Sequence, residues 1–490
     1  MSTTTATSLP DFNQPGLTWF NVPKPLSISE VFGRLVILDF WTFSCINCLH
    51  ILPSMRRIEK AFQDDVVILG IHSPNFPYER DPINVSKAIA RYHIEHPVVH
   101  DPEFKLWDAY GVKVWPTLIL VSPDGQIFAR QAGEPDGDKL LEAVGNAVRK
   151  YKAQGKLRPA GTELTKPEKQ GGVLLFPGKM KRLKYKGNFY WVVADTGHHQ
   201  IVIFNDQGQQ VQRIGRGAPA NLDGEYNRCA FDNPHGIACG EDVIYVSDLG
   251  THLIRRIDLK AQTVTTIAGT NRRGLTLTKE APGKEVGLAS VFDMELHGDQ
   301  LYFANSGTHQ IGVIDTKTLV LKPLAGGGAK DILDGAGRAA KLAQPSGLAF
   351  SAEHNRLYFA DSDNSAVRYL DLADQFNVRT VVGRGMAESG RRNGSFKTAR
   401  FQHPMGITIC QDYLIAADSF NASLRKLDIA KQTVENFAED FTCTDEAPKP
   451  LLDPEGIVWD GADRLFVVDS NNHRILAYDL TKKTWGTWTQ

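Results

Sequence analysis

Residues 35–53 read LVILDFWTFSCINCLHILP, and this stretch decides the fold of the first part of the chain. A β-branched, apolar run from Leu35 to Phe40 leads directly into the motif Cys-Ile-Asn-Cys. After the motif the apolar residues follow a helical period, with one face formed by Leu52, Met55, Ile58 and Phe62. The pattern therefore predicts a strand, a tight turn and an amphipathic helix, with the two cysteines at the start of the helix.

This placement of the cysteines has a chemical consequence. Cys45 lies at the predicted helix N-terminus, where unpaired N–H groups and a partial positive charge favour thiolate over thiol. Cys48 lies one turn further in, where it can resolve a mixed disulfide formed on Cys45. Further apolar runs at 66–71 and 118–121 predict additional strands, and this order favours a parallel or mixed sheet.

Taken together, these motifs resemble the active site of the thioredoxin fold, over roughly residues 15 to 150. Asp39, Phe40 and Trp41 match the Asp-Phe-Trp that precedes the family's motif, and Pro53 matches its helix-kinking proline. The tripeptide Trp115-Pro116-Thr117 matches the cis-proline loop that faces the cysteines.

The resemblance implies a role for each of these residues. Cys45 would be the attacking thiolate, Cys48 the resolving thiol, and Asp39 a buried carboxylate that takes the proton of Cys48. The substrate would be contacted by Trp41, Trp115, Pro116 and Thr117. The structural alternative is that Asp39 is a strand residue whose carboxylate is satisfied by hydrogen bonds and has no catalytic role.

The match to thioredoxin is incomplete at two places. Ser44 stands where thioredoxins usually carry a second Trp, and the residues between the cysteines are Ile46 and Asn47 rather than Gly-Pro. Because that dipeptide affects the redox potential, thioredoxin's potential is not transferred to this chain. The form WTFSCINCLHILP is closer to the TlpA-like branch of the family.

Other chemistries at the cysteine pair remain as alternatives. A structural zinc site would have only three ligands, from Cys45, Cys48 and His50. Haem attachment is excluded because Leu49 interrupts the Cys-x-x-Cys-His pattern. A peroxiredoxin would carry Pro where Leu38 stands, although Thr42 fits that family, and an inert structural pair is the last alternative.

The second part of the chain is a repeat. A strand–turn–strand segment such as VIYVSDLGTHLIRRIDL, which begins at Val243, occurs six times. Its shared polar position recurs every 51 to 57 residues, at Asp195, Asp248, Asn305, Asp361, Asp418 and Asp469. Upstream, elements such as NPHGIA and QPSGLAF repeat too, and three of them follow an Asp-Gly or Asn-Gly turn.

Six units of four short strands predict a six-bladed β-propeller. The motif resembles the NHL repeat over residues 173–490. Joined to a TlpA-like domain, it is similar to the family of NHL-repeat-containing protein 2. The predicted fold is thus an α/β thioredoxin fold followed by an all-β six-bladed NHL-type β-propeller. The expected domains are 1–150 and 173–490, with residues 151–172 as a linker.

The repeated polar residues have two interpretations. A metal site at the top of the propeller tunnel is one, but a single residue per blade is weak evidence for it. We favour a structural role, in which each side chain bonds backbone or a neighbouring blade. The same holds for the histidines that follow four residues after the repeated position, His199, His252, His309 and His473.

Composition and charge limit the partners. The 490 residues carry a net charge of −1, which argues against binding nucleic acid or a membrane surface by bulk electrostatics. The one basic run, 179–186, is expected to be a solvated strand and turn. With no apolar leader and six cysteines that form no disulfide framework, we expect a cytoplasmic protein in which Cys229, Cys239, Cys410 and Cys443 act as small hydrophobes.

Two functions fit the sequence. The first is a cytoplasmic thiol–disulfide oxidoreductase that needs no cofactor or metal and acts on a protein or small-molecule disulfide, with the propeller recruiting or presenting it. The second is a non-enzymatic scaffold or redox-responsive interaction platform. A scaffold has no need for two thiols in a Cys-x-x-Cys motif, so the pair at 45 and 48 discriminates between the two.

Overall fold

The computed structural model describes residues 9–165, 171–439 and 450–489, and the chain folds as two compact units that part between Lys169 and Gln170. The first unit is a mixed sheet with helices, and the second consists of six antiparallel sheets. These units confirm the predicted thioredoxin-like α/β fold and the six-bladed propeller. Among the described residues, no helix combines the length and hydrophobicity needed to span a membrane.

The first unit contains six strands and five α-helices in its described part. In chain order they are β1 (Thr18–Phe20), α1 (Ile28–Val31), β2 (Leu35–Trp41), α2 (Ile46–Phe62), β3 (Val66–His72), α3 (Pro82–Arg91), β4 (Val98–His100), α4 (Lys105–Ala109), β5 (Thr117–Val121), β6 (Ile127–Ala132) and α5 (Gly137–Ala153). The sheet order is β1-β4-β3-β2-β5-β6. Strand β2 pairs in parallel with β3 and antiparallel with β5.

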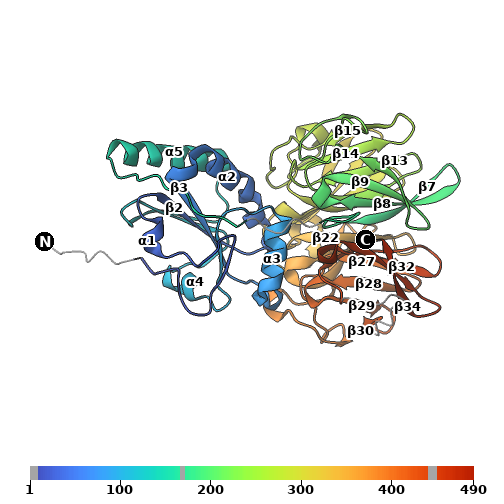
Figure 1. Ribbon diagram of the computed structural model, residues 1–490. Helices are drawn as coiled ribbons and strands as arrows, with labels where there is room; N and C mark the ends of the chain where they lie inside the picture. Colours follow the sequence, from blue (N-terminus) through green and yellow to red (C-terminus); the bar gives the residue numbers. More distant parts are fainter. Residues whose placement is uncertain (1–8, 166–170, 440–449, 490) are drawn as a thin grey trace. The chain divides into compact units, whose positions relative to one another are not determined.

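The two faces of this sheet are covered by different helices (Figure 1). Alternate residues of β2 point to opposite faces. Val36, Leu38 and Phe40 lie in one core cluster, which also contains side chains of α4. Leu35 and Ile37 lie in the other, against α2 and α5. The same alternation places Asp39 and Trp41 on the face that α2 covers.

The chain after α5 runs back along the first unit. Arg158 N donates to Gly33 O at 2.7 Å, and Thr165 N donates to Asn21 O at 3.0 Å. The Arg34 guanidinium donates to Ala160 O at 3.0 Å. The stretch predicted as a linker, 151–172, therefore begins with the end of α5, and its described residues up to 165 are bonded to the first unit.

The propeller has six blades of four long strands, with a two-residue strand added to the outer edge of the four middle blades. Blade 1 is β7 (Met180–Tyr185), β8 (Asn188–Asp195), β9 (Gln200–Asn205) and β10 (Gln210–Ile214). Blade 2 is β11 (Gly224–Glu225), β12 (Pro234–Cys239), β13 (Val243–Asp248), β14 (Leu253–Asp258) and β15 (Thr263–Ala268). Blade 3 is β16 (Ala281–Pro282), β17 (Val291–His297), β18 (Gln300–Asn305), β19 (Gln310–Asp315) and β20 (Val320–Ala325).

The remaining blades repeat this plan. Blade 4 is β21 (Gly335–Ala336), β22 (Pro345–Ser351), β23 (Arg356–Asp361), β24 (Ala366–Asp371) and β25 (Asn377–Val382). Blade 5 is β26 (Gly394–Ser395), β27 (Gly406–Cys410), β28 (Tyr413–Asp418), β29 (Ser423–Asp428) and β30 (Thr433–Phe437). Blade 6 is β31 (Pro454–Trp459), β32 (Arg464–Asp469), β33 (Arg474–Asp479) and β34 (Thr484–Thr489). Within the described residues, each blade is built from consecutive strands, and none combines strands from the two ends of the chain.

The repeated polar residue is structural, as the sequence analysis favoured. In all six blades its side-chain oxygen accepts a hydrogen bond, at 2.7 or 2.8 Å, from a backbone N–H in the loop before the blade's inner strand. In blades 4 and 5 it also binds an arginine that is fully buried, as Asp361 with Arg368 and Asp418 with Arg425. The same arginines bind the turn residues Asp334 and Asn393, which explains the repeated Asp-Gly and Asn-Gly pairs.

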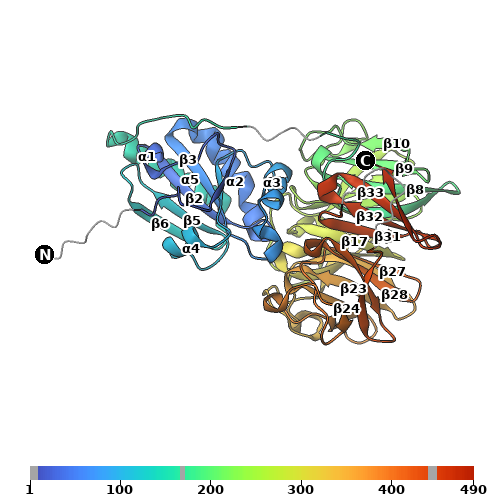
Figure 2. The ribbon, with the colours of Figure 1, turned by 60° about the horizontal axis from the view of Figure 1, so that its bottom comes forward.

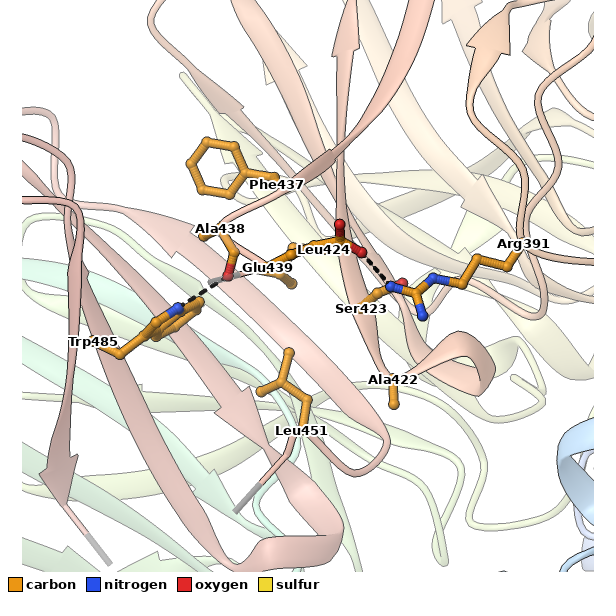
Figure 3. A pocket seen from close by; sticks show the side chains of 9 residues that line it. All are labelled: Arg391, Ala422, Ser423, Leu424, Phe437, Ala438, Glu439, Leu451 and Trp485. Carbon is orange, nitrogen blue, oxygen red and sulfur yellow. Dashed lines mark hydrogen bonds and ion pairs between the residues drawn. The ribbon is translucent and has the colours of Figure 1, made fainter. Parts of the chain in front are cut away.

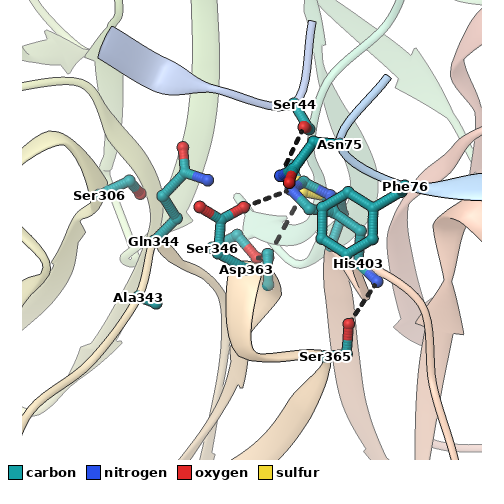
Figure 4. A network of polar contacts seen from close by, with 12 residues as sticks. Ser44, Asn75, Phe76, Ser306, Ala343, Gln344, Ser346, Asp363, Ser365 and His403 are labelled. Atoms are coloured by element: carbon teal, nitrogen blue, oxygen red, sulfur yellow. Dashed lines mark hydrogen bonds and ion pairs between the residues drawn. The ribbon is translucent and has the colours of Figure 1, made fainter. Parts of the chain in front are cut away.

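The four repeated histidines join neighbouring blades. Each has a left-handed backbone with φ of 55 to 58°, and its Nδ1 accepts a backbone N–H of the next blade at 3.0 to 3.2 Å, in the pairs His199–Asn233, His252–Ser290, His309–Gln344 and His473–Phe176. Blade 4 uses Ser365 at this position, whose Oγ accepts from His403 N (Figure 4).

The bond from Phe176 to His473 closes the ring, because it joins blade 1 to blade 6. Strands of these two blades lie side by side in Figure 2. Arg464 strengthens this closure with an ion pair to Asp206 at 2.9 Å, and Trp191 packs on Phe466 with ring centroids 4.3 Å apart. The ring is therefore closed by side chains rather than by an exchanged strand.

The expectation of a solvated basic run is wrong at its first residue. Residues 180–185 form β7, the inner strand of blade 1, and Lys179 just before it is only 3% exposed. Its Nζ donates to Met405 O at 2.5 Å and to Glu455 O at 2.6 Å. Lys181 pairs with Glu295 of blade 3. Inner strands converge on the propeller axis, so these lysines bind across the ring instead of facing solvent.

The buried repeat pair should dominate propeller stability. We expect Asp418→Ala to destabilise by about 3–5 kcal/mol, because it leaves the Arg425 guanidinium buried without its partner. The control is Asp428→Ala on the same blade, which removes a pair with the exposed Lys431 and should cost less than about 1 kcal/mol. Denaturant unfolding followed by tryptophan fluorescence measures both, and equal losses would contradict the structural role.

Candidate active site

The cysteine motif lies at the start of α2, as predicted. Cys45 is the residue that caps the helix N-terminus, with extended φ and ψ of −85° and 106°, and its side chain makes no capping bond. Its carbonyl accepts the backbone N–H groups of Cys48 and Leu49, at 2.9 and 3.2 Å. Cys45 is partly exposed and Cys48 is buried, and the structure carries both as thiols. The solvent-exposed thiol, that of Cys45, is thus the one at the positive end of the helix dipole.

The Cys48 thiol is held in its protonated form. Burial raises its pKa well above the ordinary value, and its interaction with Cys45 raises it further, while the backbone of Thr42 acts in the opposite direction. The nearby charge of Asp39 also raises this pKa. Cys48 therefore needs a base before it can act as a nucleophile.

Asp39 is placed to be that base. It is 1% exposed, and in the described part of the chain neither of its carboxylate oxygens has a hydrogen-bond partner. Burial raises its pKa from the ordinary 3.8 to about 7, and the proximity of His96 limits the rise. An Asp with a pKa near 7 can accept and return a proton at neutral pH.

Trp41 ends β2, and the predicted Trp115-Pro116-Thr117 loop leads into β5, whose Thr117 pairs with Phe40 of β2. The Trp115–Pro116 peptide bond is cis, as predicted. The side chain of Thr117 donates to Val114 O at 2.7 Å, and Trp115 packs on Trp107 with centroids 4.4 Å apart. Trp41 is only 1% exposed and meets the His72 ring edge-on.

The sequence analysis missed Glu79, which organises the loop before the cysteines. It lies in the short 3₁₀ helix η2 (Pro77–Arg80) and is fully buried. Its Oε1 accepts Thr42 Oγ1 at 2.5 Å and Ser44 N at 2.9 Å, and its Oε2 accepts Asn75 N at 2.6 Å and Phe76 N at 2.8 Å. Asn75 Nδ2 also reaches Ser44 Oγ at 3.4 Å (Figure 4).

Glu79 thus ties the 42–44 segment to the 75–76 segment with both carboxylate oxygens. No motif indicates this contact, because Glu79 is 34 residues beyond Cys45 in the chain. A Glu in a Pro-Tyr-Glu-Arg turn is ordinarily exposed, and only the folded chain shows that it is enclosed.

The remaining cysteines that the structure describes differ from Cys45. Burial raises the pKa of Cys229 to about 11 and that of Cys239 to about 12, and it raises that of Cys410 too. Cys443 lies outside the described residues. The described propeller cysteines are accordingly poor nucleophiles at neutral pH.

No competing site is evident in the described residues. Within 9–165, 171–439 and 450–489, no three His, Cys, Asp or Glu side chains are arranged to hold a metal, and His50 is bonded to Glu134 at 3.2 Å. A pocket in the propeller is lined by residues of blades 5 and 6, including Leu424, Leu451 and Trp485 (Figure 3). Its lining contains no cysteine or histidine, so it offers neither a thiol nor an imidazole base.

Comparison with known proteins places the chain in a family. A family model described as Thioredoxin-like matches residues 33–127. The chain is 33% identical to NHL repeat-containing protein 2 of Homo sapiens, over 97% of this chain and 70% of that protein. It belongs to the NHL repeat-containing protein 2 family.

Two other relatives extend this result. Protein SUPPRESSOR OF QUENCHING 1, chloroplastic, of Arabidopsis thaliana is 31% identical over 98% of this chain and 47% of its own length. Thiol-disulfide oxidoreductase YkuV of Bacillus subtilis is 28% identical over 26% of this chain and 86% of its own. A thioredoxin-like domain with thiol-disulfide oxidoreductases among its relatives indicates a redox function for this NHL repeat-containing protein 2 relative.

Replacing Glu79 with its isostere Gln should destabilise the folded chain. In Glu79→Gln one of the two acceptor positions becomes an amide NH₂ that faces backbone N–H donors. We expect a loss of about 1.5–3 kcal/mol in the free energy of unfolding. Hydrogen exchange at the Ser44 and Phe76 amides should accelerate as well. The exposed Glu103→Gln is the matched control, and unchanged protection in Glu79→Gln would refute the tethering role.

The buried Asp39 should make stability depend on pH. Its pKa is higher in the folded chain than in the unfolded chain, so the folded state binds more protons between about pH 4 and pH 7. The stability of the native chain should therefore fall as the pH rises through that range, by on the order of 4 kcal/mol. Asp39→Asn should lack this fall. Urea unfolding at pH values from 4 to 8 measures it, and parallel pH profiles for the two proteins would contradict the buried, ionisable Asp39.

Proposed function

We propose that this protein is a cytoplasmic thiol–disulfide oxidoreductase that uses Cys45 and Cys48. The observation that carries the proposal is how the site is graded from solvent to interior. A partly exposed thiol lies at a helix N-terminus, a buried thiol follows it one turn later, and a buried carboxylate interacts with the second thiol. The relatives support the class of chemistry and leave the substrate open.

The reaction follows from the two thiols. The Cys45 thiolate attacks one sulfur of a substrate disulfide, which forms a mixed disulfide and releases one substrate thiolate. Cys48 then gives its proton to Asp39, and the Cys48 thiolate attacks Cys45 Sγ. The second substrate thiolate leaves, so the substrate gains two electrons and the protein holds a Cys45–Cys48 disulfide. A reduced dithiol from another protein or a small thiol restores the pair.

The propeller is assigned to binding in this proposal. Its repeated Asp, Arg and His side chains are engaged in the ring itself, so they are not available as a second catalytic centre. Rigid propellers present loops suited to holding a protein. The described propeller cysteines are free thiols, which supports a reducing compartment.

Trapping tests the proposal on the full chain, with oxidised glutathione as the probe. We expect the native chain to form a Cys45–Cys48 disulfide and Cys48→Ser to accumulate glutathione on Cys45. Cys45→Ser should take up none, and Cys410→Ser should behave as the native chain. Peptide mass spectrometry reads each outcome.

The same experiment addresses the scaffold alternative. A scaffold would leave Cys45 unmodified, or modified no faster than Cys229 and Cys239. That result, in a chain with native circular dichroism, would refute the oxidoreductase.

A further inference from the structure

Asp39 is not the only buried polar group without a partner near the cysteines. In the described residues, the indole Nε1 of Trp41 and the imidazole Nε2 of His96 also lack hydrogen-bond partners. Trp41 is 1% exposed and His96 is 4% exposed. Leaving a buried donor or acceptor unsatisfied costs about 1–3 kcal/mol, so three such groups together point to something that they bind in common.

Gly70 brings these groups to one place. Asp39 of β2 is the register partner of Gly70 in β3, and both lie on the face covered by α2. A Cβ placed on Gly70 would lie 3.1 Å from Trp41 Nε1, 3.2 Å from Val98 Cγ2 and 3.3 Å from His96 Nε2. Both nitrogens therefore lie close beside Gly70, the register partner of Asp39, and His96 is near enough to Asp39 to lower its pKa.

His96 connects this position to solvent. Its other nitrogen, Nδ1, lies 3.1 Å from Oε1 of Glu59, and the Glu59 side chain is 29% exposed while that of His96 is 5% exposed. Glu59 belongs to α2, the helix that begins with the cysteines. The order from the interior outward is thus Cys48, Asp39, His96 and Glu59.

His72 and His100 form a second buried pair in this unit, and this pair has no such connection to solvent. His72 Nδ1 meets His100 Nδ1 at 3.1 Å, and His100 Nε2 meets the backbone carbonyl of Arg80 at 3.0 Å. A backbone carbonyl cannot release a proton to water. Among the groups that act on Asp39, the titratable ones are His96 from the segment before β4 and Cys48 from α2.

We propose that a water held beside Gly70, between Asp39, Trp41 Nε1 and His96 Nε2, links Asp39 to His96, and that the His96–Glu59 pair is the route by which the proton of Cys48 reaches solvent. The inference rests on the proposed function, because it concerns the step in which Cys48 resolves the mixed disulfide. His96 and Glu59 are positioning and proton-transfer residues that do not touch the substrate.

The protons balance over a full cycle. When Cys48 attacks, its proton passes to Asp39, through the water to His96 Nε2, and an equivalent proton leaves His96 Nδ1 for the Glu59 carboxylate and then bulk water. When a dithiol donor reduces the disulfide, a proton returns along the same route to Cys48. The return restores the starting tautomer of His96, with its proton on Nδ1. Trp41 Nε1 donates to the water and holds it in place.

The route can be tested with rapid mixing of the full, reduced chain and oxidised glutathione. Formation of the Cys45 adduct reports the first step, and it can be followed separately in Cys48→Ser. Release of the second glutathione, as the Cys45–Cys48 disulfide forms, reports the step that needs proton removal. We expect Glu59→Gln and His96→Gln to leave the first step unchanged and to slow the second about tenfold.

Two further variants separate proton transfer from mere packing. Gly70→Ala adds a methyl group 3.1 Å from Trp41 Nε1 and 3.3 Å from His96 Nε2 and changes no titratable group. Because the methyl group crowds the water between these nitrogens, it should slow the second step as Glu59→Gln does. In His96→Gly, added imidazole should restore the second rate in proportion to its concentration, which a structural role does not predict. Lys60→Gln, an exposed charge removed from the same helix, is the control and should match the native chain.

The outcomes distinguish this inference from the proposed function. If no glutathione adduct forms on Cys45 in a folded chain, the oxidoreductase is refuted and the proton route with it. If the adduct forms normally and Glu59→Gln resolves it at the native rate, the route alone is refuted. Slowing in Glu59→Gln and Gly70→Ala together with imidazole rescue of His96→Gly supports it.

Discussion

The parallel register of β2 on β3 is the constraint on which the chemistry of this protein depends. It sets Asp39 beside Gly70 on the side of the sheet that α2 covers. A carboxylate at that place is removed from water by the same helix whose N-terminus carries Cys45 and Cys48. The cost of burying it is what brings its pKa near 7. A slip of one residue would turn Asp39 to the opposite face, away from the helix that carries Cys48, and so remove the base on which the proposed function depends.

The propeller uses its polar residues in a different way. Buried Asp–Arg pairs and left-handed histidines satisfy backbone groups and connect blade to blade. Removing one partner of such a pair is costly, which accounts for its recurrence. In the proposed function, chemistry belongs to the first unit and binding to the propeller, and each unit is compact in itself.

Much of this organisation could be predicted from sequence. The run from Leu35 to Phe40, the Cys-x-x-Cys motif and the helical period after it are local patterns, and local patterns determine local structure. The propeller was predictable because its unit is repeated six times. Lys179 was misassigned, since a basic run is solvated in most proteins and only the convergence of the inner strands encloses this one.

The sequence alone determined the strand, turn and helix that hold Cys45 and Cys48, the cis-proline loop, and the number of blades. Each of these follows from a local sequence pattern or from the number of repeats. The tertiary structure decided what surrounds the thiols. Glu79, His96 and Glu59 carry no motif. Glu79 reaches Ser44, and His96 reaches Glu59, only when η2, the segment before β4 and α2 pack on one sheet. Burial and proximity set their chemistry, and both are properties of the folded chain rather than of residue order.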